Sequence, residues 1–387
     1  MKQFFINVSL ALSTILVVVF CTEGVLRFTP YKGLLPYEGT PQYYYVATKD
    51  AGYDIAPNFA SAVHRFKDGS YNIWSNSLGC FDTPYENQTP YIYLTGDSFA
   101  WGFTAFGDKW GTLLQDVSGV RVVKCGVPGY GTKQELTKAT KLLKQLPRPS
   151  LILVSYFNND EVDDAAFPNS LVYEGKLIKN LSGDPSLTYD DLEQKLPQYA
   201  TWAESYCMWN MPAHPTLQRG KCYLRNHSIL YLLSQSAVKA LVPTKLLQKI
   251  GIVNEAPPSV SVEEADSKEH LQNVGAFKTL ARSESSRLVF VLIPSKEDTM
   301  GSATTTYASI QKYLQEQGID YINPLTQFRA VASATSTSLY WPEDLHFNEK
   351  GNRLLGLIVT KELIERGLAP QSKLQATEEK MKMEFGI

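Results

Sequence analysis

The feature that most constrains the fold is a set of four continuous apolar runs of strand length, separated by amphipathic segments. Continuous rather than alternating apolar residues are typical of strands buried on both faces of a sheet. In the segment 132–146 the apolar residues fall at helical spacing, as in a helix that covers one face of a sheet. The alternation of strand and helix predicts an α/β fold with a doubly wound parallel sheet. The runs are YIYLTGD (91–97), VRVVKCGV (120–127), LILVSYFN (151–158) and RLVFVLIPS (287–295).

The amino terminus carries a different pattern, because no charged residue occurs between Lys2 and Glu23. Its apolar stretch supplies about 19 residues, and at about 1.5 Å per residue a helix of this length matches the roughly 30 Å hydrocarbon core of a bilayer. This predicts a single-pass membrane anchor over 1–27. A cleaved signal peptide is the main alternative, although Phe20 stands where a small residue is needed before a cleavage site.

The rest of the 387-residue chain divides into a linker, one globular domain and a tail. Residues 28–50 are rich in Pro, Gly and Tyr, which predicts a linker that lifts the globular part off the bilayer. The globular domain is expected over 51–368. From about 164 to 286 the strand–helix alternation stops, and a connection this long predicts a helical insertion, with one helix near 227–242. Residues 369–387 are predicted to be a charged C-terminal tail.

Composition argues against several partners. The formal net charge is −2 and no basic run is interleaved with aromatic residues, so a nucleic-acid partner is not expected. The five cysteines form no C-x-x-C pair, and no histidine lies at zinc-site spacing from them, so no metal is expected.

Cys207 and Cys222 flank a segment that contains Pro and Gly. Either a disulfide closes this segment in an oxidising compartment, or both cysteines are unpaired.

A Gly-Asp-Ser sequence ends the first apolar run. Glycine permits a sharp turn, and Ser98 then projects its hydroxyl from the carboxyl edge of the predicted strand. A serine nucleophile needs a base, and His346 is the strongest candidate because Glu343 and Asp344 are close enough in sequence to hold its imidazole. The alternative is an ordinary strand-end turn, with Asp97 capping the next helix.

Four motifs, GDSF, GVPGYGT, FNND and DLHFNEKG, occur in this order and resemble the four blocks of the SGNH or GDSL hydrolases. The resemblance covers about 75–365 without the insertion, and NSLGCFDTPYE before the first block resembles the membrane-anchored bacterial branch. It implies a flavodoxin-like three-layer sheet. It also implies that Ser98 is the nucleophile and His346 its base, and that the N–H groups of Ser98 and Gly129 and the Asn159 amide form the oxyanion hole.

Two positions depart from the family's pattern. Phe157 stands where the third block usually begins with glycine, so the end of that strand is expected to differ in shape from the family's pattern. The last block more often has its carboxylate three residues before the histidine, which here is Glu343. The anchored branch often has a spacing of two residues, which here is Asp344. We therefore expect Asp344 as the triad acid, with Glu343 as the alternative.

The resemblance implies acyl transfer through a serine ester without a cofactor. The leading hypothesis is a serine esterase that cleaves acyl esters, acetyl above all, of an envelope or extracellular glycan or another small ester. A polysaccharide O-acetyltransferase with the same triad and a membrane acyl-donor partner is the first alternative. A non-catalytic envelope scaffold is the second, although such a protein would be expected to lack the serine or the histidine.

The same branch of the family places the catalytic domain on the periplasmic or extracellular side of the membrane. The predicted insertion is rich in Tyr and Trp, and an insertion at the carboxyl ends of parallel strands usually shapes the ligand crevice. Trp202 and Trp209 are therefore expected to bind the glycan, unless they pack in a core of the insertion's own.

Overall fold

The computed structural model falls into two compact units, one made of Met1–Gly39 with Gln194–Ser259 and the other of Thr40–Glu193 with Val260–Ile387. The second unit contains the predicted sheet and the four motifs. The structure describes residues 1–34, 39–167, 170–178, 227–241, 264–301, 307–334 and 338–387, together with single positions between 190 and 224.

The first unit contains α1 (Lys2–Leu26), the 3-10 turn η1 (Pro30–Leu34) and α9 (Ile229–Leu241). The 25 residues of α1 are long and apolar enough to cross a membrane, and none of them is buried within the protein. The helix α9 is the one predicted inside the insertion. Both helices therefore form where their apolar residues predict them.

One acidic side chain at the end of α1 caps α9. The carboxylate of Glu23 accepts the backbone N–H groups of Ile229 and Leu230, both at 3.1 Å, and the hydroxyl of Ser228 at 2.9 Å. A helix leaves its first N–H groups without intrahelical partners, and a carboxylate there also interacts favourably with the helix dipole. Glu23 thus fixes where α9 begins within this unit.

The second unit is built on five parallel strands in the order β11-β10-β7-β5-β6. Renumbered along the chain and read from the β6 edge, the order is 2-1-3-4-5, which is the flavodoxin-like order of a doubly wound sheet. The prediction of an α/β fold with this sheet is therefore confirmed. The strands are β5 (Tyr91–Gly96), β6 (Arg121–Lys124), β7 (Leu151–Tyr156), β10 (Arg287–Leu292) and β11 (Asp320–Ile322).

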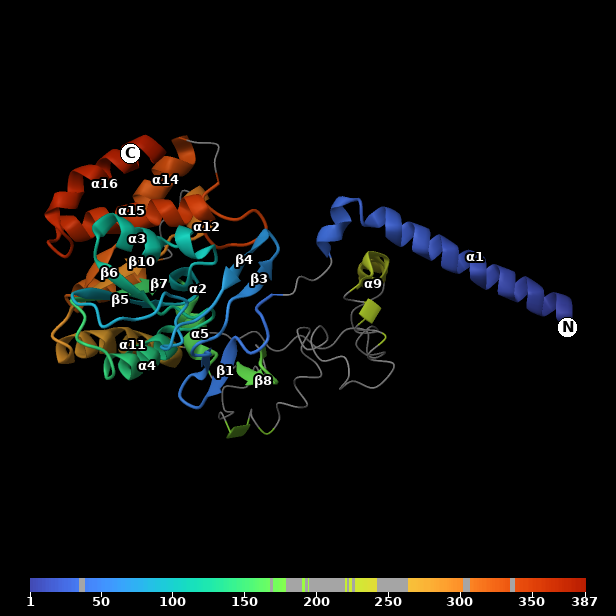
Figure 1. Cartoon of the computed structure of the whole chain (residues 1–387), viewed down its shortest axis with the longest axis horizontal. Helices are drawn as coiled ribbons and strands as arrows, with labels where there is room; N and C mark the ends of the chain where they lie inside the picture. The colour runs from blue at the N-terminus through green and yellow to red at the C-terminus, as the bar shows by residue number, and fades with distance from the viewer. Residues whose placement is uncertain are drawn as a thin grey trace. The chain divides into compact units, whose positions relative to one another are not determined.

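Helices cover both faces of this sheet, with α3, α15 and α16 on one side and α4 and α11 on the other (Figure 1). Side chains of β5 alternate between the two cores: Ile92 and Leu94 pack with α3 and α15, whereas Tyr91 and Tyr93 pack with α4 and α11. Burying one large apolar side chain contributes about 1.5 to 3 kcal/mol. The helices are α2 (Ser98–Trp101), α3 (Trp110–Ser118), α4 (Thr132–Leu143), α5 (Asp160–Ala165), α11 (Glu264–Ser283), α12 (Lys296–Met300), α13 (Ala308–Glu316), α14 (Leu325–Ala334), α15 (Glu349–Glu365) and α16 (Leu374–Phe385), with the 3-10 turns η2 (Phe106–Asp108) and η4 (Gln371–Lys373).

Three small antiparallel pairs accompany the sheet. The pair β3–β4 turns at Lys67 and Asp68, between the paired residues Phe66 and Gly69. The strand β1 lies within the predicted linker 28–50, and its neighbour Tyr44 is fully buried in an aromatic cluster with Trp101. The Tyr-rich end of the linker therefore belongs to the globular unit. The pairs are β1 (Tyr45–Thr48) with β2 (Gly52–Ile55), β3 (Ala62–Phe66) with β4 (Gly69–Ile73), and β8 (Leu171–Tyr173) with β9 (Lys176–Ile178).

Two segments pack against the sheet domain although their sequences are rich in polar residues. The helix α11 lies within the range predicted as an insertion, yet it precedes β10 and buries Val274 and Phe277 in the core below the sheet. Residues 369–387, predicted as a charged tail, contain α16, which packs on α15 and buries Met381. Charged residues of both helices are exposed, among them Lys268 and Glu269 in α11 and Glu378 and Glu379 in α16.

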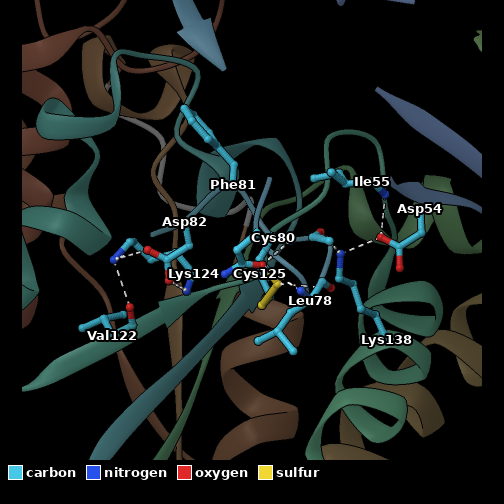
Figure 2. Close-up of a disulfide and its surroundings, with 12 residues drawn as sticks. Asp54, Ile55, Leu78, Cys80, Phe81, Asp82, Val122, Lys124, Cys125 and Lys138 are labelled. Carbon is cyan, nitrogen blue, oxygen red and sulfur yellow. Dashed lines mark hydrogen bonds and ion pairs between the residues drawn. A yellow bond between two sulfur atoms is a disulfide. The ribbon is translucent and has the colours of Figure 1, made fainter. Parts of the chain in front are cut away.

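A disulfide joins Cys80, in the segment before β5, to Cys125, directly after β6 (Figure 2). Beside it, the buried carboxylate of Asp82 pairs with Arg121 at 2.8 Å and with Lys124 at 2.9 Å. Cys207 and Cys222, for which the sequence left a disulfide and two unpaired cysteines open, lie outside the described residues. Among the described cysteines, Cys21 is the free one.

Candidate active site

The first motif places a serine at the carboxyl end of β5. Gly96 has a φ of 146°, in the region that favours glycine. A Cβ at this position would lie 2.6 Å from the Cβ of Ser155 and 2.8 Å from that of Ala100, so only glycine fits without displacing its neighbours. The chain turns here, and Ser98 begins the short helix α2.

Asp97 caps α2, as the alternative interpretation of the Gly-Asp-Ser sequence expects. Its carboxylate accepts the N–H of Phe99 at 2.8 Å and lies 3.3 Å from the Ser98 hydroxyl. The residue is fully buried. Burial raises the pKa of Asp97 to about 6, although the Phe99 N–H and the positive charge of a protonated His346 act in the opposite direction. Asp97 therefore caps α2 while Ser98 stands at the carboxyl end of β5, so both interpretations of the Gly-Asp-Ser sequence hold at once.

The last motif brings a histidine and an acid to this serine. The Nε2 atom of His346 lies 2.7 Å from the Oγ atom of Ser98, and its Nδ1 atom hydrogen-bonds Oδ1 of Asp344. Because an ionised carboxylate only accepts, Nδ1 carries the proton and Nε2 accepts the serine hydroxyl. The side chain of Glu343 is exposed. The structure thus brings together Ser98, His346 and Asp344, and it leaves the alternative acid outside the chain of hydrogen bonds.

The surroundings of His346 hold its ring in place. Burial alone would raise the pKa of Asp344, but hydrogen bonds from the His346 ring and backbone lower it below its usual value. The ring of Phe103 stacks on the imidazole with 4.0 Å between centroids. Two residues further along, Asn348 caps α15 by accepting the N–H of Gly351 at 3.0 Å. The histidine is therefore fixed between a helix start and an aromatic ring.

The second motif forms the loop after β6. Gly129 has a φ of 78°, and the loop is held beside β5 because the N–H of Val127 donates to the carbonyl of Gly96 at 3.0 Å. The hydroxyl of Tyr53 donates to the carbonyl of Pro128 at 2.8 Å. These contacts fix the Gly129 peptide group close to the strand end that carries the serine.

The third motif follows β7, and its asparagine has a partner that the sequence analysis missed. The Nδ2 atom of Asn159 donates to Oδ2 of Asp163 at 2.7 Å. The two residues are four apart around α5, and this spacing is the signal that could have revealed the pair. An amide has two N–H groups, so one remains for another acceptor. Phe157, which replaces the usual glycine, packs on Phe99 with 4.4 Å between centroids.

A second histidine also has an acidic partner that is distant in sequence. His270 on α11 is buried, and its Nδ1 atom lies 2.8 Å from Oδ2 of Asp164. Its Nε2 atom lies 3.0 Å from the hydroxyl of Tyr156. The sequence analysis found no acid near His270 because the partners are 106 and 114 residues away. This chain of hydrogen bonds ties α11 to β7 and α5.

Other predicted site residues are not placed. Trp202 and Trp209 lie outside the described residues. Within the part of the chain that the structure describes, no group of three or more His, Cys, Asp or Glu side chains could hold a metal ion.

The side chains of Ser98, His346 and Asp344 thus form one chain of hydrogen bonds, an arrangement that suits nucleophilic catalysis. The serine follows the first core strand directly, and the histidine comes before α15, the second helix after the last core strand. No protein-family model matches the sequence, and no curated protein matches it either.

Solved structures that match include a member of the lipolytic G-D-S-L family from Veillonella parvula, with 11% identity, a TM-score of 0.33, and coverage of 69% of this chain and 94% of that one. An acetyl xylan esterase matches with 9% identity, a TM-score of 0.36, and coverage of 70% and 98%. An α/β-hydrolase from the Lake Arreo metagenome matches with 9% identity, a TM-score of 0.37, and coverage of 73% and 98%. Because these identities and TM-scores are low, the description of the site rests on the chain's own topology and side-chain geometry.

Proposed function

We propose that this chain is a serine esterase of the SGNH type that cleaves acyl esters, acetyl above all, of an envelope or extracellular glycan. The observation that carries the proposal is the 2.7 Å contact between Ser98 Oγ and His346 Nε2, with Asp344 bound to the other ring nitrogen. A nucleophile, a base within hydrogen-bond reach and a group that orients the base are the three parts that nucleophilic catalysis requires.

In the proposed reaction His346 takes the proton of the Ser98 hydroxyl while Oγ attacks the ester carbonyl. Asp344 holds the imidazole in the correct tautomer and stabilises the imidazolium. The negative charge on the carbonyl oxygen is stabilised by the N–H groups of Ser98 and Gly129 and by the second amide N–H of Asn159. The imidazolium then protonates the leaving alcohol. Water, deprotonated by the same histidine, releases the acid and restores the serine.

Three features support an acylated glycan outside the cytoplasm as the substrate. The helix α1 is long and apolar enough to anchor the chain in a membrane. A disulfide between Cys80 and Cys125 is typical of a protein in an oxidising compartment. The partly exposed Trp341 packs on Phe66, which contacts the ring that stacks on His346, and the face of an aromatic ring such as that of Trp341 is suited to a sugar ring.

The catalytic part of the proposal is tested with Ser98→Ala. We expect the variant to remain folded and to lose at least about 10³-fold in hydrolysis of a short-chain aryl ester, because removing a triad member removes the nucleophilic route. A fluorophosphonate should label the wild type and not the variant. Equal labelling of both proteins would refute Ser98 as the nucleophile, and a wild type without labelling or turnover would favour the scaffold alternative.

The substrate is tested by comparing acetylated glycans, aryl acetates and phospholipids, each with and without a glycan acceptor. The esterase proposal expects free acetate from the glycan whether or not an acceptor is present. Acetate that appears on the acceptor instead would favour the O-acetyltransferase alternative, since either water or a sugar hydroxyl can take the acyl group from serine. Protease added to spheroplasts should cleave the catalytic domain if it faces outward.

A further inference from the structure

The hairpin β3–β4 is separate from the five-stranded sheet, and a two-stranded hairpin alone is marginally stable in water. Its register pairs Phe66 with Gly69, which leaves Lys67 and Asp68 as a two-residue turn. The hairpin is held by packing, since His64, Phe66 and Ile73 are buried. The packing of these side chains therefore determines which groups the turn of the hairpin can contact.

The turn contacts the backbone that carries the triad acid. The two carboxylate oxygens of Asp68 lie 3.1 and 3.2 Å from the backbone nitrogen of Glu343, and Oδ2 also accepts the N–H of Asp344 at 2.9 Å. One carboxylate thus accepts two successive peptide N–H groups from a segment 275 residues away. Hydrogen bonds to an ionised acceptor are stronger than those between neutral groups.

Further contacts fix the same segment, which contains no regular helix or strand. The ring of Phe66 packs against Trp341 with 5.2 Å between centroids, and against Phe103, which stacks on the imidazole of His346. From α12, the ammonium group of Lys296 donates to the carbonyl of Trp341 at 3.2 Å. The hairpin therefore touches both the segment before the acid and the ring behind the base.

We propose that Asp68 is a positioning residue that holds the Asp344 backbone so that its carboxylate meets Nδ1 of His346, which makes the hairpin part of the active site. The inference rests on the proposed function. Asp68 touches no reacting atom and acts through Asp344. Without it, two N–H groups lose their acceptor, and the segment keeps only contacts outside the Glu343 and Asp344 backbone N–H groups, such as Lys296 on the Trp341 carbonyl and the Trp341 N–H on the His346 carbonyl. A displacement of about 1 Å in a catalytic group can cost roughly 10²-fold in rate.

The test compares Asp68→Ala, Asp68→Asn and the matched control Lys67→Ala in the full-length protein in detergent. Lys67 is the exposed neighbour in the same turn. With a short-chain aryl ester we expect Asp68→Ala to lower kcat by about 10- to 100-fold with KM changed less than about 3-fold, because the substrate contacts stay in place. Asp68→Asn keeps a carbonyl oxygen as acceptor and should recover most of kcat. Lys67→Ala should match the wild type.

A second measurement is independent of turnover. The Nδ1 proton of His346, bound to a carboxylate, should give a strongly deshielded proton resonance in the wild type, and Asp344→Asn identifies it. We expect this resonance to weaken and shift upfield in Asp68→Ala and to persist in Asp68→Asn and Lys67→Ala.

Wild-type kcat with an unchanged resonance in Asp68→Ala would overturn the inference. Equal loss of kcat in the Ala and Asn variants would also overturn it. If Asp68→Ala does not fold, Asp68→Asn decides on its own: a folded Asn variant that has lost kcat about 10-fold or more would overturn the inference, since it keeps an acceptor oxygen. If Ser98→Ala retains wild-type turnover, the proposed function fails, whereas the resonance continues to report whether Asp68 positions Asp344.

Discussion

Removing the disulfide between Cys80 and Cys125 should destabilise the sheet domain strongly. The bridge joins residues 45 apart in sequence. In the chain-entropy account, closing a loop of this length lowers the entropy of the unfolded state enough to stabilise the fold by about 4 kcal/mol at room temperature. For a domain of this size, that loss corresponds to a fall in Tm of roughly 10 °C.

The measurement is urea and thermal unfolding of Cys80→Ala, Cys125→Ala and the double variant, followed by the fluorescence of the buried Trp101 and Trp110. Each single variant already breaks the bridge, so the single losses should nearly equal the double loss instead of adding to it. A double variant within about 1 kcal/mol of the wild type would refute the entropic reasoning. Single losses that add would show that packing of the two side chains dominates instead.

Two further predictions concern charged groups. Asp82→Asn should destabilise the domain by about 3 to 5 kcal/mol, because it leaves the buried Lys124 and the nearly buried Arg121 without their carboxylate. The control Asp116→Asn, at an exposed position, should change the midpoint of urea unfolding little. Equal midpoints for the two variants would contradict this prediction. Asp344→Asn should lower kcat severely and Glu343→Gln mildly, and the reverse ranking in ester hydrolysis would transfer the acid's role to Glu343. Folding lowers the pKa of Asp344, so this carboxylate stabilises the fold at pH values above its pKa in the unfolded chain, and the stabilisation is lost as the pH falls through the lower folded pKa. In Asp344→Asn the free energy of unfolding should therefore depend less on pH over this acidic range.

The strands and the main site residues could be predicted from the sequence for one physical reason. Continuous apolar runs identify the parallel strands, and the carboxyl ends of such strands meet at one edge of the sheet. Ser98, directly after the first run, was therefore expected at that edge, whereas Asn159 was expected there from the resemblance of its motif to a known family. His346 and Asp344 are two residues apart, so their pairing could also be recognised within one motif.

The remaining contacts had no local signal. Cys80 and Cys125 pair because the segment before β5 contacts the end of β6, where Asp82 also binds Lys124, and no spacing in the sequence indicates that contact. Asp68 binds a backbone, which carries no residue-specific pattern, 275 residues away. Polar residues dilute the helical pattern of α16, whose packing on α15 depends on a narrow buried face that includes Met381.

The cap that Glu23 places on α9 has a consequence for how the chain is made. Ser228, one of its partners, follows 205 residues later in the sequence. At about 5 to 20 residues per second of synthesis, α1 exists for roughly 10 to 40 s before Ser228 is made. During that interval β5, β6 and β7 have already left the ribosome, because all three precede residue 228. The two units must therefore assemble in interleaved order, and a ribosome stalled before residue 228 would carry an α1 helix whose acidic end still lacks its partner.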